Sequence, residues 1–271
     1  MQRKRGVHLE VVSDLSTPSF LNAFKRFISR RGPIKSVLSD NGTNFVGAHN
    51  QLKEIQDWLV SDNFQNAFGS ELAKHRIEWI FNPPSSPHFG GIYEANVKSF
   101  KTHFYKAVGC QLLTYEEFLT LTVQIESLLN SRPLCLLSND PSDCSILTPN
   151  HFLTMTSLKF IPAVDVTDVN PSRLTRFQLL DQMVQSYWKR WSCEYLTQMQ
   201  AREKWNTPSR PVVIGLVVLI KQENVPPLHW PLGVITRVCP GNDGIIRVAW
   251  VKTARGEFKR PVHKLCPLPT Q

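Results

Sequence analysis

The sequence predicts an α/β layer followed by a long helix and a small antiparallel β-barrel. Three observations lead to this fold class. Segments with strand and helix patterns alternate through the first half of the chain, which is typical of an α/β layer. A helical pattern of apolar residues then continues from Leu174 to Lys204. Four or five short strand-like segments, separated by turns, occupy roughly the last 60 residues, as in a small barrel.

The elements of the first half follow from local patterns. Thr17 followed by Pro18 is typical of a helix start, and Thr114 with Glu117 has the spacing of a capping box. Three prolines within residues 82–91 predict a loop there. The predicted order is strand 7–11, helix 18–31, strand 36–39, helix 52–59, strand 77–81, helix 92–108 and helix 115–130.

The second half contains a connector, a helix and strands. Residues 139–175 are rich in Pro, Ser, Thr and Asp and predict an extended connector. The helix that follows carries aromatic residues at helical spacing, which is more typical of a packing face than of a nucleic-acid platform. Strands are predicted at 212–221, 230–239, 244–252 and 257–262. The predicted domain limits are 1–135 for the α/β core, 136–175 for the connector, 176–205 for the helix and 206–271 for the barrel.

Composition excludes several classes of protein. Hydrophobic residues make up 42% of the 271, which is enough to bury a core and excludes wholesale disorder. The longest apolar run, Val212–Ile220, is about half as long as a membrane-spanning helix, so we expect no membrane association. The basic start, Met1–Arg5, leads into no apolar segment and predicts no secretory signal. Six scattered cysteines without C-x-x-C spacing predict reduced thiols in an intracellular protein.

The positive charge of the chain is concentrated in its second half. The net charge is +9. Residues 1–150 contain 15 Lys and Arg against 14 Asp and Glu, whereas residues 151–271 contain 16 against 8. This asymmetry indicates a polyanionic partner, such as nucleic acid, for the second half. A solvated basic surface without a partner would have the same composition.

Two acidic residues have positions typical of a metal site. Asp40 follows the predicted strand 36–39, and Glu94 lies in the first turn of the helix predicted from residue 92. Strand carboxyl ends and helix amino ends meet at one edge of an α/β layer, where acidic side chains can hold Mg²⁺. Lys98 and Lys101 follow Glu94 on the same helix face, which suits a phosphate path. Plainer roles also fit these residues: a turn at Asp40, a favourable helix dipole at Glu94 and a surface salt bridge.

The segments around these two acids resemble retroviral-type integrases. Residues 39–48 (SDNGTNFVGA) are similar to the strand that carries the second catalytic aspartate, and residues 92–101 (IYEANVKSFK) are similar to the glutamate helix. The finer resemblance is to the integrases of BEL/Pao-type LTR retrotransposons, and it extends over nearly the whole chain. It is carried by Val7–Glu10, Ser13–Thr17, Arg30–Gly32, Pro87–Gly91, Asn130–Leu134, Leu147–Pro149, Trp188–Trp191, Glu194–Leu196, Pro226-Pro227, Trp230–Gly233 and Lys264–Leu268.

The resemblance implies a ribonuclease-H-like catalytic core followed by an SH3-like barrel. It also implies an Asp-Asp-Glu triad that joins the DNA ends of the element to target DNA with Mg²⁺ or Mn²⁺. Asp40 matches the second acid and Glu94 the third, so both are expected catalytic residues and metal ligands. The implied partners, in the nucleus, are DNA and further copies of the chain. The residues expected to contact DNA are Asn41, Gly42, Asn44, Ser85, His88, Lys98, Lys101, Trp230, Arg237, Arg247, Lys252, Arg255, Lys259 and Arg260.

The first acid of the triad has no counterpart in this sequence. In the family it lies on a strand before the segment that begins here at Val7, and no acidic residue precedes Val7. Asp14 lies beside a predicted helix start, where turn formation or capping is its expected role. We therefore expect an incomplete ribonuclease-H-like core, weak metal binding and little or no strand transfer by this chain alone.

Three functions remain open on the sequence. The first is an integrase-type protein for DNA integration, inactive alone because its triad is incomplete. The second is a non-enzymatic DNA- or chromatin-binding module derived from an integrase. The third is a protein-interaction scaffold that docks through the aromatic helix from Phe177 to Met199. DNA binding with a steep salt dependence would support the first two functions and argue against the third.

Overall fold

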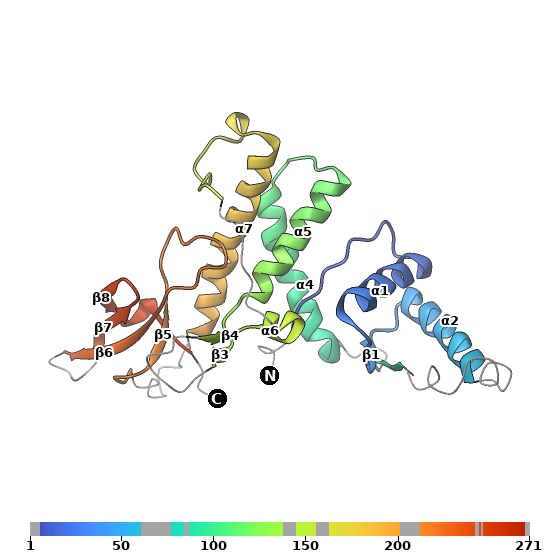
Figure 1. Ribbon diagram of the computed structural model, residues 1–271, viewed down its shortest axis with the longest axis horizontal. Helices are drawn as coiled ribbons and strands as arrows, with labels where there is room; N and C mark the ends of the chain where they lie inside the picture. Colours follow the sequence, from blue (N-terminus) through green and yellow to red (C-terminus); the bar gives the residue numbers. More distant parts are fainter. Residues whose placement is uncertain are drawn as a thin grey trace. The chain divides into compact units, whose positions relative to one another are not determined.

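The computed structural model describes residues 6–60, 77–83, 87–137, 145–155, 163–200, 212–241, 244 and 246–268 (Figure 1). The chain divides into two compact units. One unit is His8–Lys98, and the other combines Met1–Val7 with Ser99–Gln271. This division differs from the four domain limits inferred from the sequence, which remain predictions.

The unit His8–Lys98 contains two helices and a pair of parallel strands. The elements are α1 (Thr17–Arg31), β1 (Ser36–Ser39), α2 (Thr43–Val60) and β2 (Glu78–Phe81), followed by the first part of α4 (Pro87–Val108). β1 and β2 pair in parallel and are joined through α2, as in a βαβ unit. Rings from both helices and from β2 pack together, with the Phe20 ring 4.9 Å from Phe45 and 6.0 Å from Trp79. The strands predicted at 36–39 and 77–81 are confirmed.

The strand predicted at residues 7–11 is wrong. Residues 6–12 adopt no regular secondary structure. The backbone of Val7 instead forms hydrogen bonds with the side chain of Asn130. The Val7 N–H donates to Asn130 Oδ1, and Asn130 Nδ2 donates to the Val7 carbonyl, both at 2.7 Å. Glu10 accepts hydrogen bonds from Arg26 at 2.8 Å and from Arg30 at 2.5 Å, which ties this segment to α1. Alternation of apolar and polar residues predicts a strand only where a neighbouring strand can pair.

The turn before α1 has the role expected for Asp14. Its Oδ1 accepts the Ser16 N–H at 2.8 Å, and Ser16 caps the helix by accepting the Ser19 N–H at 3.3 Å. Hydrogen bonds from Ser16 lower the pKa of the Asp14 carboxyl to about 2. The helix cap is therefore Ser16, one residue before the predicted Thr17.

The second unit is built on three helices. They are the end of α4, α5 (Tyr115–Asn130) and α7 (Arg176–Met199), and the capping box of Thr114 and Glu117 is present as predicted. The aromatic stripe of α7 is a packing face: Tyr187, Trp188 and Trp191 are all buried. This burial argues against the hypothesis that the stripe is a docking face.

Short elements occupy part of the region predicted to be an extended connector. They are β3 (Cys135–Leu136), β4 (Ile146–Leu147), α6 (Pro149–Thr154) and the 3-10 turn η3 (Pro171–Arg173). β3 and β4 form an antiparallel pair. The sequence predicted an extended connector at 136–175 and did not indicate these short elements.

Five antiparallel strands complete the second unit. They are β5 (Val217–Ile220), β6 (Leu232–Pro240), β7 (Ile246–Thr253), β8 (Gly256–Pro261) and β9 (Leu265–Pro267), with the 3-10 turn η4 (Val262–Lys264) before β9. Their order in the sheet is β8-β7-β6-β5-β9. The antiparallel sheet is confirmed, whereas its closure into an SH3-like barrel remains a prediction.

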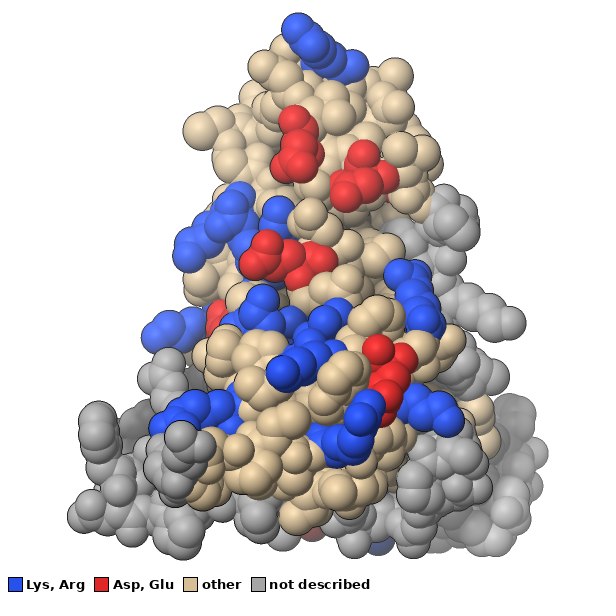
Figure 2. Space-filling view, turned by 90° about the vertical axis from the view of Figure 1, so that its left-hand side faces the viewer, with Lys and Arg blue, Asp and Glu red and all other residues tan. Residues whose placement is uncertain are grey.

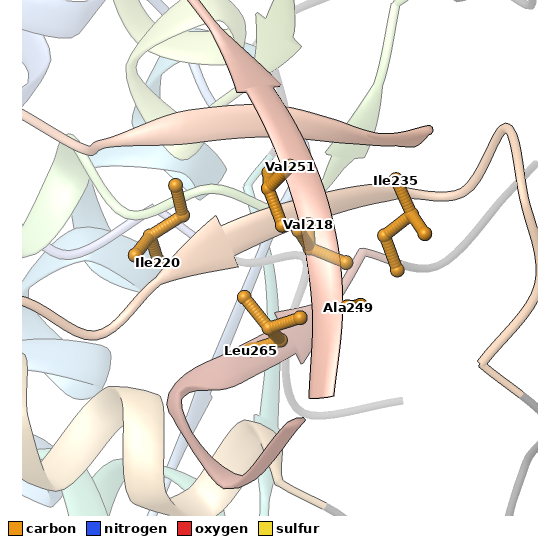
Figure 3. Close-up of a cluster of buried hydrophobic side chains, with 6 residues drawn as sticks. All are labelled: Val218, Ile220, Ile235, Ala249, Val251 and Leu265. Carbon is orange, nitrogen blue, oxygen red and sulfur yellow. The ribbon is translucent and has the colours of Figure 1, made fainter. Parts of the chain in front are cut away.

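The inner face of this sheet carries a compact apolar core. Figure 3 shows its six buried side chains, which come from four of the five strands: Val218, Ile220, Ile235, Ala249, Val251 and Leu265. On β7 the buried residues Ala249 and Val251 alternate with Trp250 and Lys252, which point to the opposite face. The core thereby fixes which side chains of the sheet reach its outer face. Among the described residues, no helix is long and apolar enough to cross a membrane.

Candidate nucleic-acid interface

The outer face of the C-terminal sheet carries an aromatic residue between two cations. Trp250 on β7 pairs directly with Arg237 on β6 and with Lys259 on β8. Side chains of directly paired residues point to the same face, so the three form a row across the sheet. The Arg237 guanidinium lies 4.6 Å from the centre of a Trp250 ring. In the neighbouring row Lys252 pairs with Glu257. We call Thr236, Arg237, Trp250, Lys252, Glu257 and Lys259 the outer face.

A bulge in β6 brings Arg237 to this face. Ile235 pairs with Val251, whereas Arg237 pairs with Trp250, so the two β6 residues oppose adjacent residues of β7. One extra residue, Thr236, lies between them. In a regular strand with Thr236 paired in register, Arg237 would point to the same side as Ile235, into the apolar core. β-Bulges commonly re-aim a side chain in this way.

The outer face is basic and contains one partly neutralising acid. Arg237 donates a hydrogen bond to Glu257 at 2.9 Å, and Thr236 also donates to Glu257. The Thr236 hydrogen bond, together with Arg237 and the charge of Lys252, lowers the pKa of the Glu257 carboxyl. Figure 2 views the molecule from the side of β6–β8 and shows more Lys and Arg than Asp and Glu there. Three cations against one carboxylate can attract a polyanion.

The sequence did not point to three residues of this surface, Thr236, Trp250 and Glu257, of which Trp250 is the centre of the row. Its position in the predicted strand 244–252 places it opposite to Ala249 and Val251, and this alternation was the available signal. The partner of the Trp250 ring, Arg237, could not be identified from the sequence because the bulge shifts the register of β6.

The prediction that Trp230 contacts DNA is contradicted by its burial. Only 7% of Trp230 is exposed. Its rings lie 4.8 Å from Trp188, 5.6 Å from Tyr195 and 6.1 Å from Trp191. Trp230 is therefore a core residue that joins the sheet to α7.

The other predicted basic residues of the sheet lie away from this row. Arg247 is exposed on β7, and Arg255 is exposed in the turn between β7 and β8. Arg260 pairs with Ala249, on the inner side of the sheet, and its guanidinium lies 5.1 Å from the Phe258 ring. Of the predicted cations on these strands, the structure thus brings together Arg237, Lys252 and Lys259.

Asp40 lies at the carboxyl end of the parallel strand pair. It directly follows β1, it is exposed, and its Oδ1 accepts the Gly42 N–H at 2.9 Å. This hydrogen bond is an Asx-turn, the plainer role considered for the residue. Asn41 Nδ2 donates to the Asn82 carbonyl at 2.8 Å and so links the ends of β1 and β2.

The turn after Asp40 leads directly into α2. A side chain at Gly42 would approach the side chains of Asn44 at 2.8 Å and Asp40 at 3.1 Å, so the turn is closely packed around this glycine. The Gly42 carbonyl accepts the N–H groups of Phe45 and Val46, at 2.9 and 3.0 Å. Asn41, Gly42 and Asn44 therefore form the Asx-turn and the helix start.

Glu94 is not in the first turn of its helix. α4 begins at Pro87, so Glu94 is its eighth residue. The expectation that the amino end of the helix dipole stabilises the Glu94 carboxylate is therefore wrong. Pro87 is tolerated because the first residue of a helix needs no N–H donor. Lys98 and Lys101 are exposed on the same helix. The side chains of His88 and Glu94, and the whole of Ser85, lie outside the described residues.

Of the two side chains expected to bind the metal ion, the structure describes one. Asp40 has a carboxylate at the appropriate strand end, while the side chain of Glu94 is outside the described set. Among the side chains that the structure describes, no group of three His, Cys, Asp or Glu could hold a metal ion. One carboxylate does not make a divalent-cation site, so we derive no catalytic step through a metal.

Comparisons with known proteins found two similarities. Residues 175–268, which run from the cap of α7 to the end of β9, match a family of unknown function (DUF5641). A chain in a cryo-electron microscopy structure of the simian T-cell lymphotropic virus intasome with the PP2A regulatory subunit B56 gamma has a TM-score of 0.31 and 15% identity. That match covers 94% of this chain and 65% of the other, so this chain spans less than two thirds of its length. No curated protein matched the sequence.

Proposed function

We propose that this chain is a DNA-binding protein related to integrases, and that the outer face of its C-terminal sheet contacts the DNA backbone. The row of Arg237, Trp250 and Lys259 carries the DNA part of the proposal. Lysine and arginine side chains bind DNA chiefly by neutralising phosphates, without a need for base recognition. We therefore expect DNA binding with little sequence preference.

The aromatic ring has a positioning role in this proposal. A guanidinium over a tryptophan ring gains about 0.5–1 kcal/mol at an exposed site. This attraction orders Arg237 on the sheet before DNA arrives, and an ordered side chain loses less entropy on binding. Glu257 orders the same guanidinium by accepting its hydrogen bond, but the carboxylate also lowers the net positive charge of the outer face.

Binding of a short labelled DNA duplex tests the proposal, with fluorescence anisotropy as the readout. The outer-face variant replaces Arg237, Lys252 and Lys259 with Gln. Its matched control replaces three exposed cations elsewhere in the same unit, in the variant Lys106→Gln/Arg173→Gln/Arg190→Gln. Both variants change the net charge equally. We expect the outer-face variant to lose at least about tenfold in affinity and the control about twofold or less. Equal losses would contradict a localised interface.

The integrase relationship rests on where the similar segments lie. Residues 39–48 run from the end of β1 into α2, and residues 92–101 lie within α4. A strand end with an aspartate and a helix with a glutamate are the elements that the resemblance requires. We propose on this basis an ancestry in the BEL/Pao-type integrases and a ribonuclease-H-like origin for the first unit. Assembly with further copies and a nuclear location belong to the same proposal.

Metal-dependent strand transfer is the second candidate function, favoured by Asp40 at the carboxyl end of parallel β1. Asp40 and Glu94 are the proposed ligands of Mg²⁺ or Mn²⁺. A strand-transfer assay with either ion tests the candidate, with Asp40→Asn as the variant. Joining that depends on Asp40 would support an integrase that works as a single chain. DNA binding without joining would support the non-enzymatic alternative.

A further inference from the structure

Two adjoining cavities share the loop that joins β5 to β6: the larger lies between this loop and α7, and the smaller between this loop and the end of β8. The larger has a volume of about 540 Å³, which is within the range of small-molecule pockets. The smaller has a volume of about 410 Å³. Lys221, Gln222, Glu223 and Lys264 line both, so the two cavities meet along these residues.

The walls of the larger cavity are apolar, with polar groups among them. Apolar surface comes from Trp188, Leu196, Val225, Pro226 and Pro227. Hydrogen-bonding side chains from both the helix and the loop also line the cavity: Ser192, Gln200 and Asn224. Ser192 and Gln200 already donate hydrogen bonds to the carbonyls of Trp188 and His263. The assignment of a heterocycle therefore rests on the apolar walls, in which the rings of Trp188, Pro226 and Pro227 offer surfaces for a planar ligand.

The smaller cavity is strongly basic. Four cations line it, Lys221, Lys259, Arg260 and Lys264, against the single carboxylate of Glu223. Within the part of the chain that the structure describes, none of these four cations forms a salt bridge. A concave surface with this excess of positive charge favours a phosphate group.

The loop between the cavities is held in a fixed conformation. Trp188 Nε1 donates a hydrogen bond to the Val225 carbonyl at 2.9 Å, which ties the loop to α7. Asn224 and Leu228 have positive φ angles of 54° and 64°. A leucine in this region is strained, and such strain is often kept where a loop is held for binding.

We propose that the two cavities form one site for a nucleoside phosphate, with the heterocycle in the apolar cavity and the phosphate in the basic one. This goes beyond the proposed DNA interface, which contacts backbone phosphates through the outer face. Lys259 belongs to both surfaces and is left out of the test. The ligand is either a free nucleotide or a nucleotide within a single strand, because both present the same chemistry.

Thiol protection tests the site on the full chain. Cys193 is exposed and lines the larger cavity, whereas Cys110 is exposed and lies outside both cavities. We expect AMP, at ten times its dissociation constant, to slow alkylation of Cys193 by about tenfold and to leave Cys110 unchanged. Adenosine and inorganic phosphate should each protect more weakly than AMP, because each fills one cavity. Unchanged alkylation of Cys193 at millimolar AMP would overturn the proposal.

Paired variants make the test specific. Lys221→Gln/Lys264→Gln should abolish the protection, while Lys106→Gln/Arg173→Gln, with the same change in charge, should keep it. Resistance of the buried Cys135 to alkylation reports in each case that the chain is folded. Equal protection by an alkyl phosphate would overturn assignment of the heterocycle.

Stronger protection by a single-stranded oligonucleotide than by AMP would assign the site to a nucleotide within a strand, and the reverse to a free nucleotide. Duplex binding by the outer face is measured separately, so either proposal can fail alone.

Discussion

Replacement of Trp230 separates its structural role from the DNA contact that the sequence predicted. Burial of a tryptophan removes about 150–250 Å² from water, which contributes about 4–6 kcal/mol at 25 cal/mol per Å². Alanine recovers a small part of this through its own methyl group. We therefore expect Trp230→Ala to lower the free energy of unfolding by about 3–5 kcal/mol. The interactions lost include the three ring contacts, with Trp188, Trp191 and Tyr195, and the hydrogen bond that Trp230 Nε1 donates to Ser131 Oγ at 3.4 Å.

Urea denaturation followed by circular dichroism measures this effect. With a slope of about 2–3 kcal/mol per molar urea, the midpoint should fall by about 1–2.5 M. DNA affinity, measured where the variant is still folded, should change by less than about twofold. The matched variant is Trp250→Ala, which should weaken DNA binding about threefold through loss of the cation–π contact with Arg237 and destabilise the chain less. A Trp230→Ala chain of unchanged stability and reduced DNA affinity would refute the reasoning.

Three further outcomes are expected. Gly233→Ala should cost about 1–3 kcal/mol in urea denaturation, because the new Cβ would lie 2.4 Å from a methyl carbon of Val251; unchanged stability would contradict this packing. Hydrogen bonds from Arg176 lower the pKa of the Glu117 carboxyl to about 2, so the pair stabilises the fold above about pH 4.5 and this stability is lost as the pH falls towards 2. Glu117→Gln should therefore lower the urea midpoint at pH 7 more than at pH 2. Burial raises the pKa of the Cys266 thiol to about 11, so it should react with a thiol reagent only after unfolding.

Local signals in the sequence predicted those elements that depend on near neighbours. The capping box of Thr114 and Glu117 lies where it was expected, because both partners belong to one helical turn. The strands at 36–39 and 77–81 were each predicted from their own residues and are confirmed, although their pairing was not predicted. Asp14 forms the expected turn for the same reason, through contacts within a few residues.

Features that depend on distant contacts could not be predicted. The segment 7–11 has the alternation of a strand, but the side chain of Asn130 satisfies the backbone of Val7 instead of a neighbouring strand. The burial of Trp230 depends on three aromatic residues of α7, about 40 residues away in sequence. The outer face depends on one extra residue in β6, and alternation alone would have placed Arg237 in the core.

The salt dependence of duplex binding measures how many phosphates the outer face contacts. The logarithm of the association constant should fall linearly with the logarithm of salt concentration, with a slope of about −0.9 for each phosphate contact. Removal of Arg237, Lys252 and Lys259 removes three cations from the outer face. We expect the slope of this variant to be shallower by about 2–3 and the slope of the control variant to be nearly unchanged. An unchanged slope for the outer-face variant would show that these cations do not contact phosphates and would contradict the account.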